Sequence, residues 1–182
     1  RNIAPWPRPR SRRRCRDVYE CGAELGRFMN NDTSHSPTNE SIMRSMIPFL
    51  IFTDVAFFIY WAISGLMLLG LELVPVDYLY NDYHNPLMYA WNWSFFPLDM
   101  VLAVTGLMSV RRFRAGNAAW YPIALFSIAL TFCAGFMAVS FWAFTKDFDP
   151  TWWIPNLFFT CWPLYFLRKF LAVKKIESSE VD

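Results

Sequence analysis

Two aspartates stand inside apolar stretches of the chain, and they are the residues best placed to do chemistry. Asp54 is the only charged residue of the stretch 45–71, and Asp99 is the only one of 85–110. An aspartate at the centre of a membrane helix costs about 2.5–3.5 kcal/mol on insertion scales, so neither should face lipid. An ionised carboxylate among aromatic rings could bind a lipophilic cation, and a carboxyl that takes up and releases a proton could serve a relay. The alternative is helix packing alone, for which polar groups contribute about 0.6 kcal/mol on average.

Polar and irregular residues gather around Asp99 at helical spacing. Asn92 lies seven residues before it and Gly106 seven residues after it, which places all three on one helix face. Pro97 has no N–H to donate to the carbonyl of Trp93, so we expect a kink there.

The last apolar stretch has a comparable face, formed by Asn156, Thr160 and Pro163. The candidate residues for ligand binding or proton coupling are Asp54, Asp99, Asn92, Trp91, Asn156 and Thr160. The candidate kinks are Pro97, Pro155 and Pro163.

The elements that carry these residues follow from composition. The chain is 55% hydrophobic and 19% aromatic, and its charges cluster between long apolar runs. Because about 20 apolar residues span a bilayer as a helix, we predict transmembrane helices near 47–71, 87–110, 118–144 and 152–172. The fold class is therefore all-α, a four-helix transmembrane bundle, in a domain of residues 44–175.

Counting along the helices places the two acids at similar depth. Asp54 lies ten residues past Arg44, about 15 Å, and Asp99 lies twelve residues before Arg111, about 18 Å. Since consecutive antiparallel helices pack as neighbours, we expect the two carboxyls to face each other in an interior between the first, second and fourth helices.

Aromatic residues with a polar edge fall mostly near the ends of the predicted spans, where such rings prefer the headgroup level. We interpret them as membrane anchors. They are Trp61, Trp91, Trp93, Trp120, Tyr121, Trp142, Trp152 and Trp153.

The orientation follows from the basic residues. Nine Lys and Arg precede the first span, three lie at 111–114, four follow the fourth span, and only Lys146 remains. The positive-inside rule then places both termini in the cytoplasm and the segments 72–86 and 145–151 outside, in a multi-pass protein of the bacterial cell membrane.

Residues 1–43 differ in kind, being Arg- and Pro-rich and then polar, and we predict disorder there. The chain begins with Arg, so we expect either a fragment or an upstream extension, with Met29 and Met43 as candidate native starts. Beside a membrane span its charge is expected to orient the protein, and no nucleic-acid partner is predicted. Residues 176–182 form a short acidic tail.

Several kinds of active site are disfavoured. The four cysteines form no C-x-x-C pair, and both histidines fall outside the predicted spans. A thiol oxidoreductase, a haem site and a zinc site are therefore not expected, and no phosphate-binding loop or serine nucleophile motif appears. We predict no cofactor, no metal and no catalytic residue, and an enzyme is the less favoured class.

Four blocks resemble a known family. The segments "FTDVAFFIYW", "NPLMYAWNWSFFPLD", "FMAVSFWAF" and "FDPTWWIPNLFF" are similar to the YvaD-like bacterial membrane proteins, over about residues 47–170. The resemblance implies a four-helix membrane fold and brings no assigned activity.

A more remote resemblance is to the EXPERA membrane domain of emopamil-binding and related proteins. It covers Asn85-Pro86 through Trp91, Ser94, Phe95 and Asp99, and it implies that Asp99 lines a lipophilic cavity. Asp54 stands earlier than that superfamily's acid on the first helix, and the histidine of its isomerases has no counterpart within the spans. Sterol isomerisation is therefore not expected.

These residues predict an integral membrane protein that binds a lipophilic or amphiphilic small molecule in an interior lined by Asp54 and Asp99. The alternatives are a proton-coupled, transporter-like protein and a non-catalytic accessory subunit of a larger membrane complex. The expected partners are accordingly the lipid bilayer, a lipophilic small molecule and a membrane-protein partner.

Overall fold

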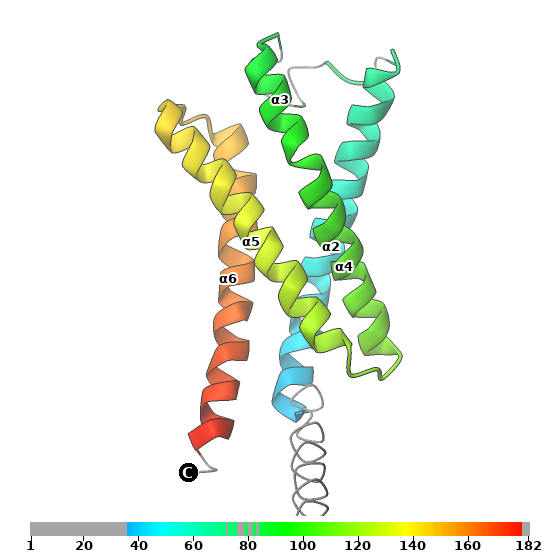
Figure 1. Ribbon diagram of the computed structural model, residues 1–182, viewed down its shortest axis with the longest axis vertical. Coiled ribbons are helices and arrows are strands. Elements are labelled where there is room, and N and C mark those ends of the chain that lie inside the picture. The colour runs from blue at the N-terminus through cyan, green and yellow to red at the C-terminus, as the bar shows by residue number, and fades with distance from the viewer. Residues whose placement is uncertain (1–35, 72, 76–78, 80–81, 83, 180–182) are drawn as a thin grey trace, which may run out of the picture. The chain divides into compact units, whose positions relative to one another are not determined.

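The part of the chain that the structure describes is built from helices and connecting turns. The computed structural model describes residues 36–71, 73–75, 79, 82 and 84–179 (Figure 1). Because α3 and α4 follow one another with a single residue between them, the helices form four long segments, which confirms the predicted number. The helices are α2 (Pro37–Leu68), α3 (Pro86–Ser94), α4 (Phe96–Arg114), α5 (Trp120–Thr145) and α6 (Pro150–Ser179).

The first helix starts earlier than predicted. α2 begins at Pro37, inside the segment expected to be disordered, and residues 1–35 of that segment lie outside the described residues. Proline is favoured at the first helical position, and Glu40 pairs with Arg44 one turn later at 3.7 Å. The polar run before Met43 is thus the first turns of a helix. At the other end, α6 continues to Ser179, through most of the predicted acidic tail.

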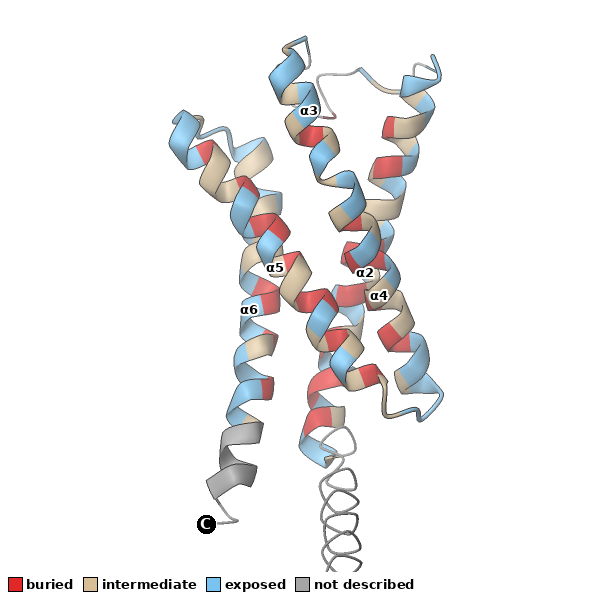
Figure 2. Cartoon of the chain, viewed as in Figure 1, coloured by how far each residue is buried: buried red, intermediate tan, exposed pale blue. Residues whose placement is uncertain are grey.

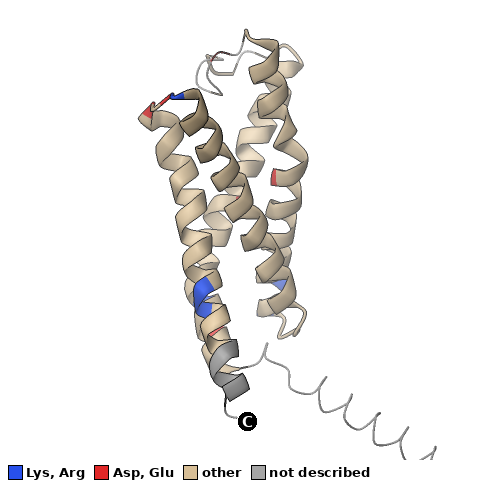
Figure 3. Cartoon of the chain, turned by 60° about the vertical axis from the view of Figure 1, so that its left-hand side comes forward, with Lys and Arg blue, Asp and Glu red and all other residues tan. Residues whose placement is uncertain are grey.

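The helices pack in a closed ring. α2 packs on α4, α4 on α5, α5 on α6, and α6 returns to α2 (Figure 1). Since the helical segments alternate in direction, the basic last turn of α4 and the basic part of α6 lie toward one end of the bundle. The acidic α5–α6 connection lies toward the other end (Figure 3). These ends are called the basic end and the acidic end below.

The bundle has an apolar exterior, which is compatible with contact with lipid. Exposed large side chains occur on every long helix and include Phe52, Ile59, Val104, Phe136 and Leu171. Three segments are long and apolar enough to cross a membrane, namely Pro37–Leu68, Pro86–Arg114 and Trp120–Thr145. α6 is as long, but Trp, Pro, Thr and Asn residues interrupt its apolar run, and it is not among the described helices that are apolar enough to cross a membrane.

The interior near the basic end is filled by side chains from all four segments, and Figure 2 shows buried residues where the helices meet. Several tryptophans belong to the interior as well. Trp61, Trp120 and Trp142 are buried, so they are packing residues and not the exposed anchors that the sequence suggested. The core of the basic end includes Met43, Met46, Leu50, Val110, Trp120, Ala124, Ile128, Trp162, Phe166 and Phe170.

Candidate functional site

A break in the second helical segment positions Asp99. The segment pauses at Phe95, two residues before Pro97, and the N–H of Phe95 donates to the carbonyl of Asn92 at 3.1 Å. α4 then starts at Phe96, so Asp99 lies in the first turn of a new helix. Phe95 itself keeps right-handed helical dihedrals, so the backbone continues from α3 into α4 and the break is limited to the hydrogen bonds near Pro97.

The Asp99 carboxyl is buried, with 4% of the residue exposed, and one of its oxygens is held by the neighbouring helix. The indole N–H of Trp61 on α2 donates to Oδ2 at 2.9 Å. The second oxygen, Oδ1, has no hydrogen-bond partner within the described part of the chain. A buried acceptor without a hydrogen bond costs about 1–3 kcal/mol, so a ligand that donates a hydrogen bond to Oδ1 would gain by satisfying it.

Asn92 is held in a similar way by the adjacent residue of α2. The hydroxyl of Tyr60 lies 2.9 Å from Asn92 Oδ1 and 3.1 Å from the carbonyl of Leu79, and its single proton is shared between these two acceptors. Asn92 is 8% exposed, and its Nδ2 is buried without a partner in the described structure. Tyr60 and Trp61 thus each fix one polar side chain of the broken segment.

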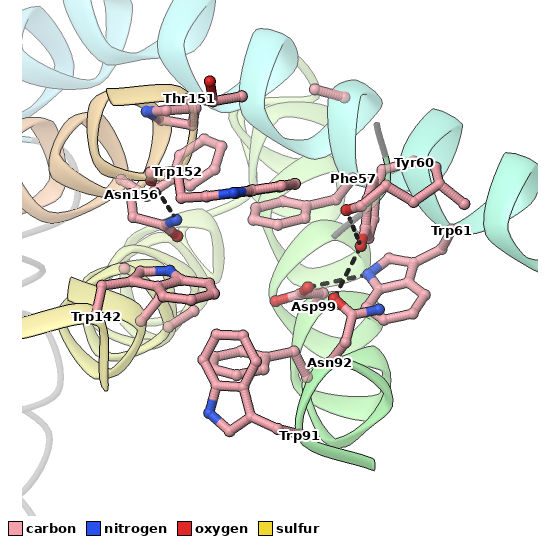
Figure 4. Close-up of a pocket in the computed structure, with 18 residues that line it drawn as sticks. Phe57, Tyr60, Trp61, Trp91, Asn92, Asp99, Trp142, Thr151, Trp152 and Asn156 are labelled. Atoms are coloured by element: carbon pink, nitrogen blue, oxygen red, sulfur yellow. Dashed lines mark hydrogen bonds between the residues drawn. The ribbon is translucent and has the colours of Figure 1, made fainter. Parts of the chain in front are cut away.

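These side chains line a pocket of about 360 Å³ (Figure 4). Its lining includes Thr151 and Trp152 beside the α5–α6 connection, so the pocket lies toward the acidic end of the bundle. Among the described residues that line it, Asp99 is the one that carries a charge. The small residues Ala134, Gly135 and Ala138 of α5 leave the space. The aromatic lining residues are Phe57, Tyr60, Trp61, Trp91, Phe95, Trp142, Trp152 and Phe159.

The α2–α4 half of the bundle and the α5–α6 half meet through aromatic contacts beside this pocket. Trp91 of α3 stacks on Phe141 of α5, with ring centroids 4.1 Å apart and planes at 23°. Trp91 also packs edge-on against Trp142, at 5.3 Å. α5, the third predicted span, therefore contributes a wall of the pocket, whereas the sequence-based prediction placed the polar interior between the first, second and fourth predicted spans alone.

Gly135 brings α5 and α6 together at the opposite wall. A Cβ at this position would lie 2.8 Å from backbone atoms of Asn156, Phe159 and Thr160, closer than real Cβ contacts allow. Only glycine permits this approach of the two backbones, and the approach sets Asn156 at the pocket.

The start of α6 is fixed by the short connection from α5. Lys146 takes a left-handed conformation, with φ of 59°, which ends α5, and Asp149 Oδ1 accepts from the N–H of Thr151 at 2.8 Å at the start of α6. The Nδ2 of Asn156 donates to the carbonyl of Trp152 at 2.7 Å. Thr151, Trp152 and Asn156 consequently face the pocket from the side opposite Asp99 (Figure 4).

Asp54 lies elsewhere. It is fully buried against Gly106, where any Cβ would collide with Asp54 Oδ2, and neither of its carboxyl oxygens has a hydrogen-bond partner among the described residues. Asp54 is not among the residues that line the pocket. The expected meeting of Asp54 and Asp99 is therefore not found.

The helix register explains this difference. Asp54 and Trp61 are seven residues apart on α2, and their partners Gly106 and Asp99 are seven residues apart on α4, about 10 Å along the axis. The sequence-based estimate of depth assumed that Arg44 and Arg111 lie at the same height in the membrane. In the structure α2 and α4 are displaced along their axes relative to that assumption.

The sequence candidates thus separate into two groups. Trp91, Asn92, Asp99 and Asn156 line the pocket, as does Pro155. Asp54 and Thr160 do not, and Thr160 Oγ1 donates to the carbonyl of Asn156 at 2.8 Å within its own helix. Pro155 and Pro163 lie inside α6, which continues through both.

Other lining residues were not among the sequence candidates for the site. Tyr60, Trp61, Trp142 and Trp152 belong to it, and the tryptophans had been assigned to the membrane interface. One sequence signal could have identified Trp61. It follows Asp54 by seven residues, just as Gly106 follows Asp99 by seven, but this match predicts a contact between Trp61 and Asp99 only when the register between the two helices is known.

Residues 46–177, which include the whole pocket lining, match a family of unknown function, DUF5360. The chain belongs to this family. It is 42% identical over 129 residues to the uncharacterized protein YvaD of Bacillus subtilis (strain 168), an alignment that covers 71% of this chain and 93% of YvaD. No solved structure matches the chain significantly. The YvaD-like resemblance is confirmed, and the remote resemblance to the EXPERA domain stays a prediction.

Proposed function

We propose that this protein resides in the bacterial cell membrane and binds an amphiphilic molecule with a cationic head group in the pocket beside Asp99. The observation that carries the proposal is Asp99 Oδ1, a buried acceptor that has no partner among the described residues. It belongs to the only charged residue in the described lining of an aromatic pocket. The pocket volume of about 360 Å³ falls within the range of small-molecule sites.

The chemistry of the lining favours a cation over a neutral or anionic ligand. An ammonium N–H would donate to Oδ1 while Trp61 continues to hold Oδ2. The rings around the carboxyl add cation–π attraction of about 0.5–2 kcal/mol, and they also accept an alkyl chain. An anionic head group would be repelled by Asp99.

The charge distribution supports an orientation as well. The basic end of the bundle is assigned to the cytoplasm and the acidic end to the outside, in keeping with the positive-inside rule. The pocket would then lie in the outer half of the membrane.

Binding of radiolabelled dodecylamine to the full chain in phosphatidylcholine nanodiscs tests the proposal. We expect saturable binding of one amine per chain, displaced by unlabelled dodecylamine but poorly by dodecanol. Asp99→Asn should weaken binding about 10- to 150-fold, because a hydrogen bond to a charged group contributes about 1.5–3 kcal/mol. Asp54→Asn removes a buried carboxyl outside the pocket and is the matched control, with affinity unchanged. Equal binding by the parent protein and Asp99→Asn would refute the proposal.

Asp54 favours a second candidate, proton-coupled transport of the bound amine. It is a buried carboxyl nearer the basic end than Asp99, and its oxygens are without hydrogen-bond partners in the described structure. On this second candidate, proteoliposomes would accumulate dodecylamine in response to a pH gradient, and Asp54→Asn would abolish uptake while leaving binding intact. Identical uptake by the parent protein and Asp54→Asn would refute proton-coupled transport through Asp54.

A further inference from the structure

We infer that Asn92 is a second recognition group of this site and that it selects amines with a hydroxyl group close to the nitrogen. The inference rests on the proposed binding of an amphiphilic cation at Asp99. It adds a specificity-determining residue and narrows the ligand class from amines in general to amphiphilic amino alcohols.

The first argument is the state of the Asn92 side chain. Asn92 is 8% exposed, and Tyr60 fixes one end of its amide through the hydroxyl that donates to Oδ1 at 2.9 Å. Tyr60 is itself held in place by its second acceptor, the carbonyl of Leu79, at 3.1 Å. The other end of the amide, Nδ2, is buried and makes no hydrogen bond within the described part of the chain. Buried polar groups of this kind are rare, and a ligand oxygen would satisfy it.

The second argument is the pairing of Asn92 with Asp99. Their holders, Tyr60 and Trp61, are consecutive residues of α2, so both polar side chains are fixed to the same wall of the pocket (Figure 4). That wall presents one free donor, Asn92 Nδ2, and one free acceptor, Asp99 Oδ1. A single head group can satisfy both only if it has an N–H and an oxygen acceptor close together.

The remaining lining limits the rest of the ligand. Opposite this wall lie Trp142 and Trp152, with Thr151 and Asn156 as polar residues beside them (Figure 4). Phe159 also lines the pocket. The Nδ2 of Asn156 is already engaged by the carbonyl of Trp152. An alkyl chain fits this side, and the polar head fits the side of Asn92 and Asp99. A protonated amino alcohol with one alkyl chain has the required arrangement, whereas a quaternary ammonium lacks the N–H.

A matched pair of probes tests the inference in nanodiscs that contain the full chain. The probes are 2-(dodecylamino)ethanol and N-propyldodecylamine, which share charge and size and differ by a hydroxyl in place of a methyl group. We expect the parent protein to bind the amino alcohol about 3- to 10-fold more tightly, the value of one neutral hydrogen bond. Asn92→Leu should bind the two probes with equal affinity, so the ratio of the two affinities measures the role of Asn92 even where the variant changes the affinity for both. Asp99→Asn should weaken both probes alike.

The outcomes separate the two proposals. Equal affinities for the two probes in the parent protein, or a preference that persists in Asn92→Leu, would overturn the role of Asn92 and leave binding at Asp99 intact. Failure of both probes to bind the parent would overturn the proposed function together with this inference. Tyr60→Phe provides a second variant should Asn92→Leu not fold, because it removes the hydroxyl that orients Asn92, and it should reduce the preference.

Discussion

A single methyl group added at Gly106 tests the α2–α4 register that places Asp99 at the pocket and Asp54 away from it. In Gly106→Ala the new Cβ would collide with Asp54 Oδ2 and lie 2.8 Å from Cγ. Overpacking of this kind costs about 1–3 kcal/mol, while replacing glycine by alanine within a helix returns about 0.5–1 kcal/mol. The net destabilisation is therefore up to about 2.5 kcal/mol.

Removing the obstacle should reverse the sign. The three atoms nearest the new methyl group all belong to the Asp54 carboxyl, so in an Asp54→Ala background Gly106→Ala should stabilise the protein by about 0.5–1 kcal/mol. Gly65→Ala is the matched control, because a Cβ at Gly65 would meet no atom within 4 Å and should give the same small gain in either background.

Thermal unfolding in detergent, followed by tryptophan fluorescence, measures these effects at about 2–4 °C per kcal/mol for a chain of this size. The expected result is a lower melting temperature for Gly106→Ala and a higher one for Gly106→Ala combined with Asp54→Ala, relative to each background. If Gly106→Ala behaves like Gly65→Ala whether or not Asp54 is present, Asp54 does not pack on Gly106 and the register is incorrect.

Three further predictions concern the walls of the site and its orientation. Gly135→Ala should destabilise the protein by about 1–3 kcal/mol, because its Cβ would meet backbone atoms of α6 that cannot rotate away; an unchanged melting temperature would contradict the close packing. Trp61→Phe should cost about 1–3 kcal/mol by leaving Asp99 Oδ2 unpaired, and a double-mutant cycle with Asp99→Leu should show coupling, whereas strict additivity would deny the hydrogen bond. A cysteine at position 82 in place of Asp82 should react with a membrane-impermeant thiol reagent in intact cells, and reaction only after the cytoplasm is opened would reverse the orientation.

The helices and the break near Asp99 could be predicted from the sequence because each depends on local chemistry. Long apolar runs require helices, and Pro97 removes a backbone donor wherever it stands. The residues 37–43 show the limit of this reasoning. Their polarity suggested a tail, yet Pro37 and Glu40 are also suited to a helix start, and composition does not distinguish the two.

Which residues form the site could not be predicted in full, because that depends on the register between helices and no single helix specifies it. Asp54 and Asp99 have similar surroundings in the sequence, and only the space above Gly106 distinguishes them, because it accepts the Asp54 carboxyl. The tryptophans were a second difficulty. An indole suits both a membrane interface and a buried donor, and the partner of Trp61 is 38 residues away in the chain.

Photolabelling with a dodecylamine analogue that carries a diazirine in its alkyl chain tests the central claim most directly, because it locates the amine on the protein. In nanodiscs, mass spectrometry should find adducts on pocket residues such as Ala138, Trp142 and Phe159. These adducts should disappear with excess dodecylamine or in Asp99→Asn. Adducts confined to outward-facing residues such as Phe136 and Phe144, equal in the parent protein and in Asp99→Asn, would contradict a binding site at Asp99.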